Sequence, residues 1–150
     1  MIVVNPAPFD GALFLLDSSL ITMISSTAST PLGRYVDAFN SRDYVAMQQV
    51  FDVNLRTIHP GEPEVDVTSA EPFLARMQAL WPRGIHYRLL RTIVGGDLAS
   101  KGEVWGELLA LDAQDKPLAS ELVVYRVEGG LVCEICVYKQ MHPTHPDYQS

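Results

Sequence analysis

Two titratable side chains in this sequence stand where acid–base chemistry would need them. His59 directly precedes Pro60 at the end of a segment in which apolar and polar residues alternate, and Glu134 interrupts the apolar segment 131–139. An imidazole titrates near neutral pH, so His59 can act as a general base or acid. A carboxylate enclosed in an apolar strand is costly unless it is paired or protonated, and His59 is the partner that we expect for Glu134.

A third candidate is Tyr35, which could donate a hydrogen bond to a substrate oxygen on which charge develops. Each candidate also has a structural explanation. His59 could bond a loop carbonyl, and Tyr35 could simply pack in the core. Glu134 could form a salt bridge at a dimer interface, or its face could be assigned one residue off. Glu121 is a weaker candidate because it lies near the start of a strand, where water can reach it.

The two cysteines, Cys133 and Cys136, are predicted to be free thiols. Three residues apart in a strand, their Cα atoms are roughly 10 Å apart, which exceeds the disulfide limit of about 7 Å. Free thiols indicate a reducing compartment, so we expect a cytoplasmic protein. With His142 and His145 the cysteines superficially suggest zinc, but the gap between cysteine and histidine is far shorter than a zinc finger needs. We therefore expect no metal.

Charge and motifs exclude several other functions. A net charge of -7 without a cluster of Lys and Arg argues against nucleic-acid binding. The sequence has neither a Gly-rich phosphate loop before a helix nor a Gly-x-Ser-x-Gly motif, which disfavours nucleotide binding and serine hydrolysis. Asp10 and Asp17 interrupt the apolar residues near the N-terminus, so we expect neither a secretory signal nor a membrane span.

The elements that must position these residues follow in a clear order. Thr30 and Pro31 suit the N-cap and first turn of a helix, Asp43 can cap a second helix, a strand covers 55–59, and Ser69 begins a third helix. The remainder predicts four strands, Ile85–Val94, Lys101–Leu111, Leu118–Val127 and Leu131–Lys139. Helices followed by an antiparallel meander indicate an α+β fold.

The length of 150 residues suits one domain with a sizeable core. We assign residues 30–140 to this domain. Residues 1–29 would form an N-terminal extension or an extra helix, and residues 141–150 a C-terminal tail.

The segment Arg34–Pro60 resembles the opening of the nuclear transport factor 2-like superfamily, through Ala38-Phe39-Asn40, Asp43 and Phe51, and the segment 125–132 is similar to its last hairpin. This superfamily includes ketosteroid isomerases, SnoaL-like polyketide cyclases, scytalone dehydratase and limonene-epoxide hydrolase. The resemblance implies a cone-shaped, cystatin-like fold, in which N-terminal helices pack on a curved antiparallel sheet and enclose a pocket. It also implies a homodimer through the outer face of the sheet.

The resemblance to ketosteroid isomerase places Tyr35 at the oxyanion-hole tyrosine and His59 at the general base. Val123 stands at the second oxyanion donor of that enzyme, and Lys139 stands near the catalytic aspartate of the cyclases. Lys101 and Glu103 loosely match the basic and acidic pair of limonene-epoxide hydrolase.

The same comparison assigns strand faces, because side chains alternate along a strand. If Val123 faces the pocket, Glu121 and Tyr125 do so as well. On the last strand it places Glu134, Cys136 and Tyr138 in the pocket and Cys133, Ile135 and Val137 outside. The residues expected to bind substrate are Phe39, Phe51, Trp81, Trp105, Glu121, Val123, Cys136 and Tyr138, with further apolar walls from Phe73, Met77 and Leu80.

Three functions remain open at this point. The first is a small, cofactor-independent lyase or isomerase acting on a hydrophobic polyketide-, terpenoid- or steroid-like molecule, with His59, Tyr35 and Glu134 as its catalytic residues. The second is a ligand-binding or dimerisation module without catalysis, whose cone would be filled or closed and whose His59 and Glu134 would not converge. The third is an epoxide hydrolase in which Glu103 or Glu134 activates water, and it needs a cation such as Lys101 beside the acid inside the pocket.

Overall fold

The computed structural model describes residues 30–141, so the predicted N-terminal extension and nearly all of the predicted tail lie outside the described residues. The elements are α3 (Pro31–Asn40), α4 (Tyr44–Gln48), β1 (Phe51–Ile58), a 3₁₀ turn (Pro63–Val65), α5 (Ala70–Gln78), a second 3₁₀ turn (Trp81–Arg83), β2 (His86–Gly96), β3 (Lys101–Leu111), β4 (Pro117–Glu128) and β5 (Leu131–Met141). Over the described residues, no helix is both long and apolar enough to cross a membrane.

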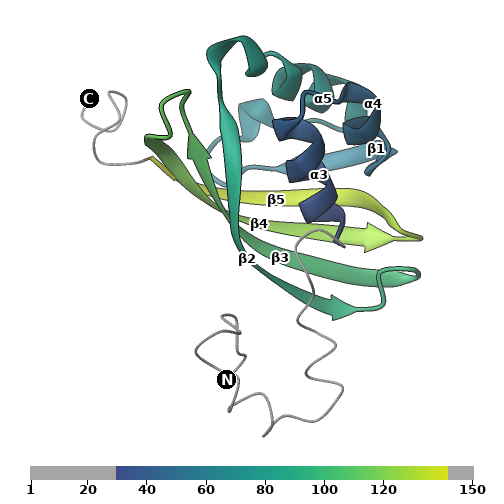
Figure 1. Ribbon diagram of the computed structural model, residues 1–150. Helices are drawn as coiled ribbons and strands as arrows, with labels where there is room; N and C mark the ends of the chain where they lie inside the picture. Colours follow the sequence, from purple (N-terminus) through teal and green to yellow (C-terminus); the bar gives the residue numbers. More distant parts are fainter. Residues whose placement is uncertain (1–29, 142–150) are drawn as a thin grey trace, which may run out of the picture.

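The five strands form one curved sheet in the order β1-β5-β4-β3-β2, with the helices on one side of it (Figure 1). Strands β2 to β5 pair antiparallel in sequence order, as the meander predicted. Strand β1 joins the edge of β5 in the parallel direction. The predicted α+β, cone-shaped fold is therefore confirmed, and its sheet is antiparallel except at this one edge.

The helix starts follow the local signals in the sequence. The hydroxyl of Thr30 accepts a hydrogen bond from the backbone N–H of Gly33 at 2.9 Å, and the carboxylate of Asp43 accepts one from Ala46 at 3.0 Å. Each bond satisfies a backbone donor that the first turn of a helix leaves unpaired. At the other end of α3, Asn40 exchanges two hydrogen bonds with the backbone of Tyr87, at 2.8 and 2.9 Å. The helix is thereby tied to β2.

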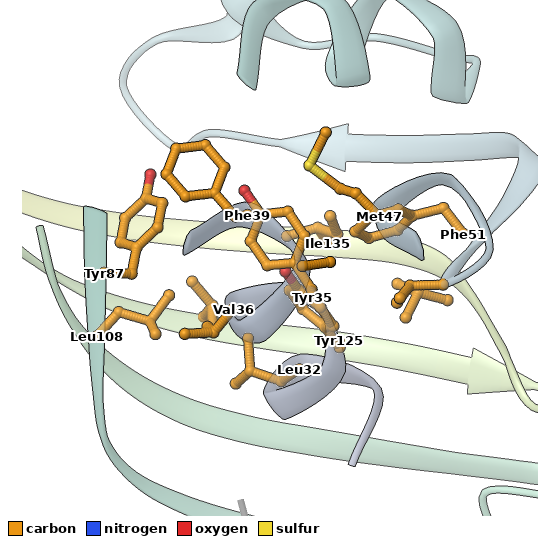
Figure 2. Packing of buried hydrophobic residues seen from close by; sticks show 14 of the residues in the cluster. Leu32, Tyr35, Val36, Phe39, Met47, Phe51, Tyr87, Leu108, Tyr125 and Ile135 are labelled. Atoms are coloured by element: carbon orange, nitrogen blue, oxygen red, sulfur yellow. The ribbon is translucent and has the colours of Figure 1, made fainter. Parts of the chain in front are cut away.

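Helix α3 lies directly against the sheet because β3 has a glycine beneath it. Leu32, Tyr35, Val36 and Phe39 recur at helical spacing and are buried on its sheet-facing side (Figure 2). A Cβ atom built on Gly106 would lie only 2.1 Å from Cδ2 of Leu32. The missing side chain thus allows the close approach that brings the tyrosine of α3 over the inner face of the sheet.

Candidate active site

A cavity of about 290 Å³ lies between the helices and the inner face of the sheet. This volume is close to the lower end of the range for small-molecule sites. Phe73, Met77 and Leu80 wall it on the side of α5, as predicted, and Val123 does so on the side of β4. The side chains that give it polar character are Tyr35, His59, Glu62, Arg76, Tyr87, Glu121, Tyr125 and Lys139.

His59 lines the cavity immediately after β1 and is held by an aspartate. Its Nδ1 lies 2.9 Å from Oδ1 of Asp66, and the same oxygen accepts the backbone N–H of His59 at 2.7 Å. The imidazole is 18% exposed. When Nδ1–H donates to the carboxylate, Nε2 keeps its lone pair and is free to accept a proton. This is the arrangement of a histidine positioned as a general base by a carboxylate partner.

Asp66 was not predicted from the sequence, because its place depends on how the loop after β1 folds back. Glu62 N–H bonds the carbonyl of His59 at 2.9 Å, which turns the chain at Pro60. The segment then returns beside β1, where Thr57 N–H bonds the carbonyl of Val67 at 3.0 Å and the hydroxyl of Thr57 accepts the N–H of Val67 at 2.9 Å. The available signal was an acidic residue shortly after the Pro60–Pro63 turn.

Three tyrosine side chains from different elements converge on the cavity. Tyr35 comes from α3, Tyr87 from β2 and Tyr125 from β4, and the Tyr35 ring centroid lies 6.4 and 6.3 Å from the other two (Figure 2). Burial raises the pKa of all three hydroxyls, and the charge of Glu121 raises it further. The phenols therefore stay protonated near neutral pH, so each hydroxyl can donate a hydrogen bond as well as accept one. Of the three, the sequence had assigned such a role to Tyr35 alone.

Glu121 faces the cavity from β4, together with Val123 and Tyr125, as the alternation along this strand predicted. Burial raises the pKa of its carboxyl, and the ammonium group of Lys139 partly offsets this effect. Lys139 is its cross-strand neighbour on β5 and also lines the cavity. Glu121 is thus the inward-facing acid of the sheet.

The prediction that Glu134 faces the pocket is wrong. Glu134 lies on the outer face of the sheet, where Arg56 donates two hydrogen bonds to it, one of them from Nε at 3.0 Å, and a nitrogen of Arg126 lies 3.4 Å away. His59 and Glu134 are therefore on opposite sides of the sheet. The acid is paired, as its apolar surroundings required, but its partners are the two arginines.

A β-bulge determines the face that Glu134 occupies. Arg126 on β4 is paired with Glu134 and the next residue, Val127, with Val132, so β5 has one extra residue, Cys133, at this point. Plain alternation from the buried Val132 would turn Glu134 inward, whereas the extra residue shifts the phase of the strand by one. The inward side chains of β5 are consequently Ile135, Val137 and Lys139.

The other predicted substrate-binding residues divide into two groups away from the cavity. Cys136, Tyr138 and Trp105 lie in a groove on the outer face with Glu134, which corrects their predicted orientation. Phe39 and Phe51 are buried in the core, where Phe51 packs edge-on against Tyr35 at 5.4 Å between ring centroids. Trp81 is partly buried and packs on Phe39 at 6.0 Å. These rings support the cavity wall from behind without lining it.

The residues needed for the epoxide hydrolase hypothesis also lie outside the cavity. Lys101 is largely exposed and pairs with Glu128 at 3.7 Å, and Glu103 faces the outer groove. Both cysteines are free. Within residues 30–141, no three His, Cys, Asp or Glu side chains are grouped so that they could hold a metal ion. The histidines of the tail that could have joined the cysteines in a zinc site lie outside the described residues.

Comparison with known proteins agrees with this fold. The structure of this chain resembles that of a proposed ketosteroid isomerase from Kribbella flavida, with a TM-score of 0.62 and 18% sequence identity over 77% of this chain and 79% of the other. It also resembles a proposed polyketide cyclase from Sinorhizobium meliloti (12% identity over 76% and 100%, TM-score 0.59) and a cystatin-like protein of unknown function from Nostoc punctiforme (14% over 87% and 97%, TM-score 0.60). A search of curated proteins finds no match. The family model of the SnoaL-like domain matches residues 32–135, and the chain therefore belongs to the SnoaL-like family.

Proposed function

We propose that this protein is a small, cofactor-independent isomerase or lyase that moves protons on a hydrophobic small molecule. The observation that carries the proposal is the histidine–aspartate pair at an apolar cavity that also contains three phenol hydroxyls. The pair supplies a base, the phenols supply donors, and the apolar walls bind a carbon skeleton. The two free thiols support a cytoplasmic location.

In this proposal, Nε2 of His59 removes a proton from a carbon atom of the bound molecule. Asp66 orients the ring through Nδ1 and stabilises the imidazolium that forms. The Tyr35 hydroxyl donates a hydrogen bond to the oxygen on which negative charge develops. A positioned base typically contributes about 10²- to 10⁴-fold to a rate, and one well-placed donor roughly 10²- to 10³-fold.

The alternative of a binding module without catalysis made two structural predictions. His59 and Glu134 do not converge, as that hypothesis expected. The cone is neither filled nor closed, however, since a cavity of about 290 Å³ remains inside it. The carboxylate beside His59 is Asp66 instead of Glu134. An open cavity with this pair at its wall favours the enzyme over the binding module.

The base can be tested without knowing the natural substrate. The probe 5-nitro-1,2-benzisoxazole is small and apolar, and loss of its C3 proton to a base breaks the N–O bond and releases a coloured cyanonitrophenolate. We expect catalysed turnover that falls at least roughly 100-fold in His59→Ala, because this is the contribution of a positioned base.

The chain offers a matched control for this variant. His86 also pairs with an aspartate, at 2.7 Å from Asp115, but lies away from the cavity, so His86→Ala should leave turnover unchanged. Glu134→Gln on the outer face should do the same. The assignment fails if the wild-type protein is no better than free imidazole, or if the two histidine variants behave alike.

A further inference from the structure

The cavity contains a carboxyl group, that of Glu121, which has no role in the reaction proposed above. Glu121 and Glu62 are the two carboxylates among the described residues that line it, and Glu62 lies in the exposed loop after β1. Glu121, in contrast, projects from the middle of the sheet, with Lys139 on one neighbouring strand and Leu108 on the other. All three side chains line the cavity.

The strand register gives the position of Glu121 relative to His59. Ile58 is level with Cys136 on β5, which places His59 next to Val137, and Val137 pairs with Val123 on β4. Glu121 is two residues further along β4 on the same face. Two strand spacings of about 4.8 Å and one two-residue step of about 6.8 Å put the two Cα atoms roughly 12 Å apart. Both side chains line the same cavity of about 290 Å³.

No partner in the described part of the chain neutralises the Glu121 carboxyl at close range. Lys139 affects it through its charge, but no ion pair or hydrogen bond joins the two side chains within residues 30–141. Glu121 lines the same cavity as Tyr35, Tyr87 and Tyr125, and its charge raises the pKa of all three hydroxyls. Glu121 is partly buried and faces the cavity, so water or a bound ligand can reach its carboxyl and form a hydrogen bond with it.

We propose that Glu121 is a second catalytic residue, the general acid that faces His59 across the bound molecule. This inference rests on the proposed function. His59 takes a proton from carbon, the electron pair of the broken C–H bond forms the new π bond, and the oxygen that gains electrons takes the proton of Glu121. In an elimination that oxygen departs as water or an alcohol, and in an enolisation it becomes the enol hydroxyl. The proton then returns from His59 to Glu121 through solvent.

The acidities of the polar groups support this division of roles. Burial raises the pKa of Tyr35 so far that its hydroxyl can donate a hydrogen bond but gives up its proton poorly. The pKa of Glu121 is also raised, which favours a protonated carboxyl, yet a carboxyl remains a far better proton donor than a buried phenol. Seven other titratable or charged groups line the cavity with Glu121. They are its cross-strand neighbour Lys139 together with Tyr35, Tyr87, Tyr125, Arg76, Glu62 and His59.

A series of benzisoxazoles with different leaving groups tests the acid separately from the base. The 5-nitro compound releases a stable phenolate, so a general acid accelerates its N–O cleavage little. Unsubstituted 1,2-benzisoxazole releases a more basic phenolate, so proton donation to the departing oxygen accelerates its cleavage more. We expect Glu121→Gln to slow the unsubstituted compound at least roughly tenfold more than the nitro compound. With the unsubstituted compound, the wild-type rate should fall as pH rises through the titration of Glu121, and this fall should be absent from the glutamine variant.

Controls separate an acid from a structural residue. Glu121→Asp retains a proton and should restore part of the leaving-group dependence, while Glu103→Gln on the outer face should change nothing. An equal loss for all benzisoxazoles, or no loss, refutes the role of Glu121. If Glu121→Gln does not fold, the wild-type profile decides, because an unsubstituted compound without an alkaline fall in rate also refutes it. Turnover of the nitro compound that does not depend on His59 refutes the proposed function instead.

Discussion

Replacing Gly106 by alanine tests the contact that places α3, and with it Tyr35, over the sheet. The new Cβ atom would lie 2.1 Å from Cδ2 of Leu32, far inside van der Waals contact. Leu32 is completely buried, so its side chain has no free space to occupy. Overpacking of this kind costs about 1–3 kcal/mol, while the lower entropy of the unfolded alanine chain returns roughly 0.4–1 kcal/mol. With the middle of each range, the net expectation is a loss of about 1.3 kcal/mol of unfolding free energy.

Thermal and urea unfolding followed by circular dichroism would measure this loss. For a chain of 150 residues, in which 1 kcal/mol corresponds to about 2–4 °C, the melting temperature should fall by roughly 3–5 °C. Gly95→Ala is the matched control, since Gly95 lies in β2 and nothing would come within 4 Å of its new Cβ atom. That variant should be as stable as the wild type or slightly more stable.

A double-mutant cycle identifies the cause. Leu32→Ala alone should cost about 2–5 kcal/mol through the cavity that it leaves. Adding Gly106→Ala to this background should cost nothing or recover part of the loss, because the clashing atoms are gone. A Gly106→Ala protein that is as stable as the wild type, or costs that simply add in the double variant, would show that the close approach of α3 does not limit stability.

Two further predictions concern the base and the outer face of the sheet. Asp66→Asn should lower turnover of 5-nitro-1,2-benzisoxazole roughly tenfold or more, because it disturbs the tautomer and orientation of His59. Asp115→Asn alters the equivalent pair at His86 and should leave turnover unchanged. Equal rates for both variants would mean that Asp66 does not position His59. Trp105 and Tyr138 in the outer groove are 44% and 51% exposed, so we expect this face to form a homodimer. Sedimentation should give twice the chain mass of 16.6 kDa for the wild type and a single chain mass for Trp105→Glu. A monomeric wild-type protein would contradict the expected dimer.

Local patterns predicted most of the fold because they depend on residues close in sequence. Strand β3 has the predicted bounds, Lys101–Leu111, since period-two alternation and the turns on either side fix it. The caps at Thr30 and Asp43 need only the first turn of each helix. The resemblance to ketosteroid isomerase placed Tyr35, His59 and Val123 at the pocket, and alternation along the strand added Glu121; all four line the cavity.

The parts that failed depend on distant contacts. One extra residue at Cys133 reverses the face of everything that follows it in β5, and no feature of the strand itself announces the bulge. The predicted face of Glu134 was wrong, and Arg56, one of its two arginine partners, lies 78 residues away in the sequence. Asp66 escaped notice because a loop, rather than a periodic element, brings it to His59.

The parallel pairing of β1 with β5 has a consequence for the order of assembly. Strand β1, which leads to His59, is synthesised early, but its neighbour in the sheet is β5, the last strand of the described chain. Closing such a long loop is entropically costly and slow compared with forming the β2–β5 hairpins. The helices and the meander can form before β1 pairs, so the strand that leads to His59 joins the sheet only when β5 is in place. A ribosome-bound chain that has not yet released β5 would contain all three cavity tyrosines while β1 still lacked its neighbour in the sheet.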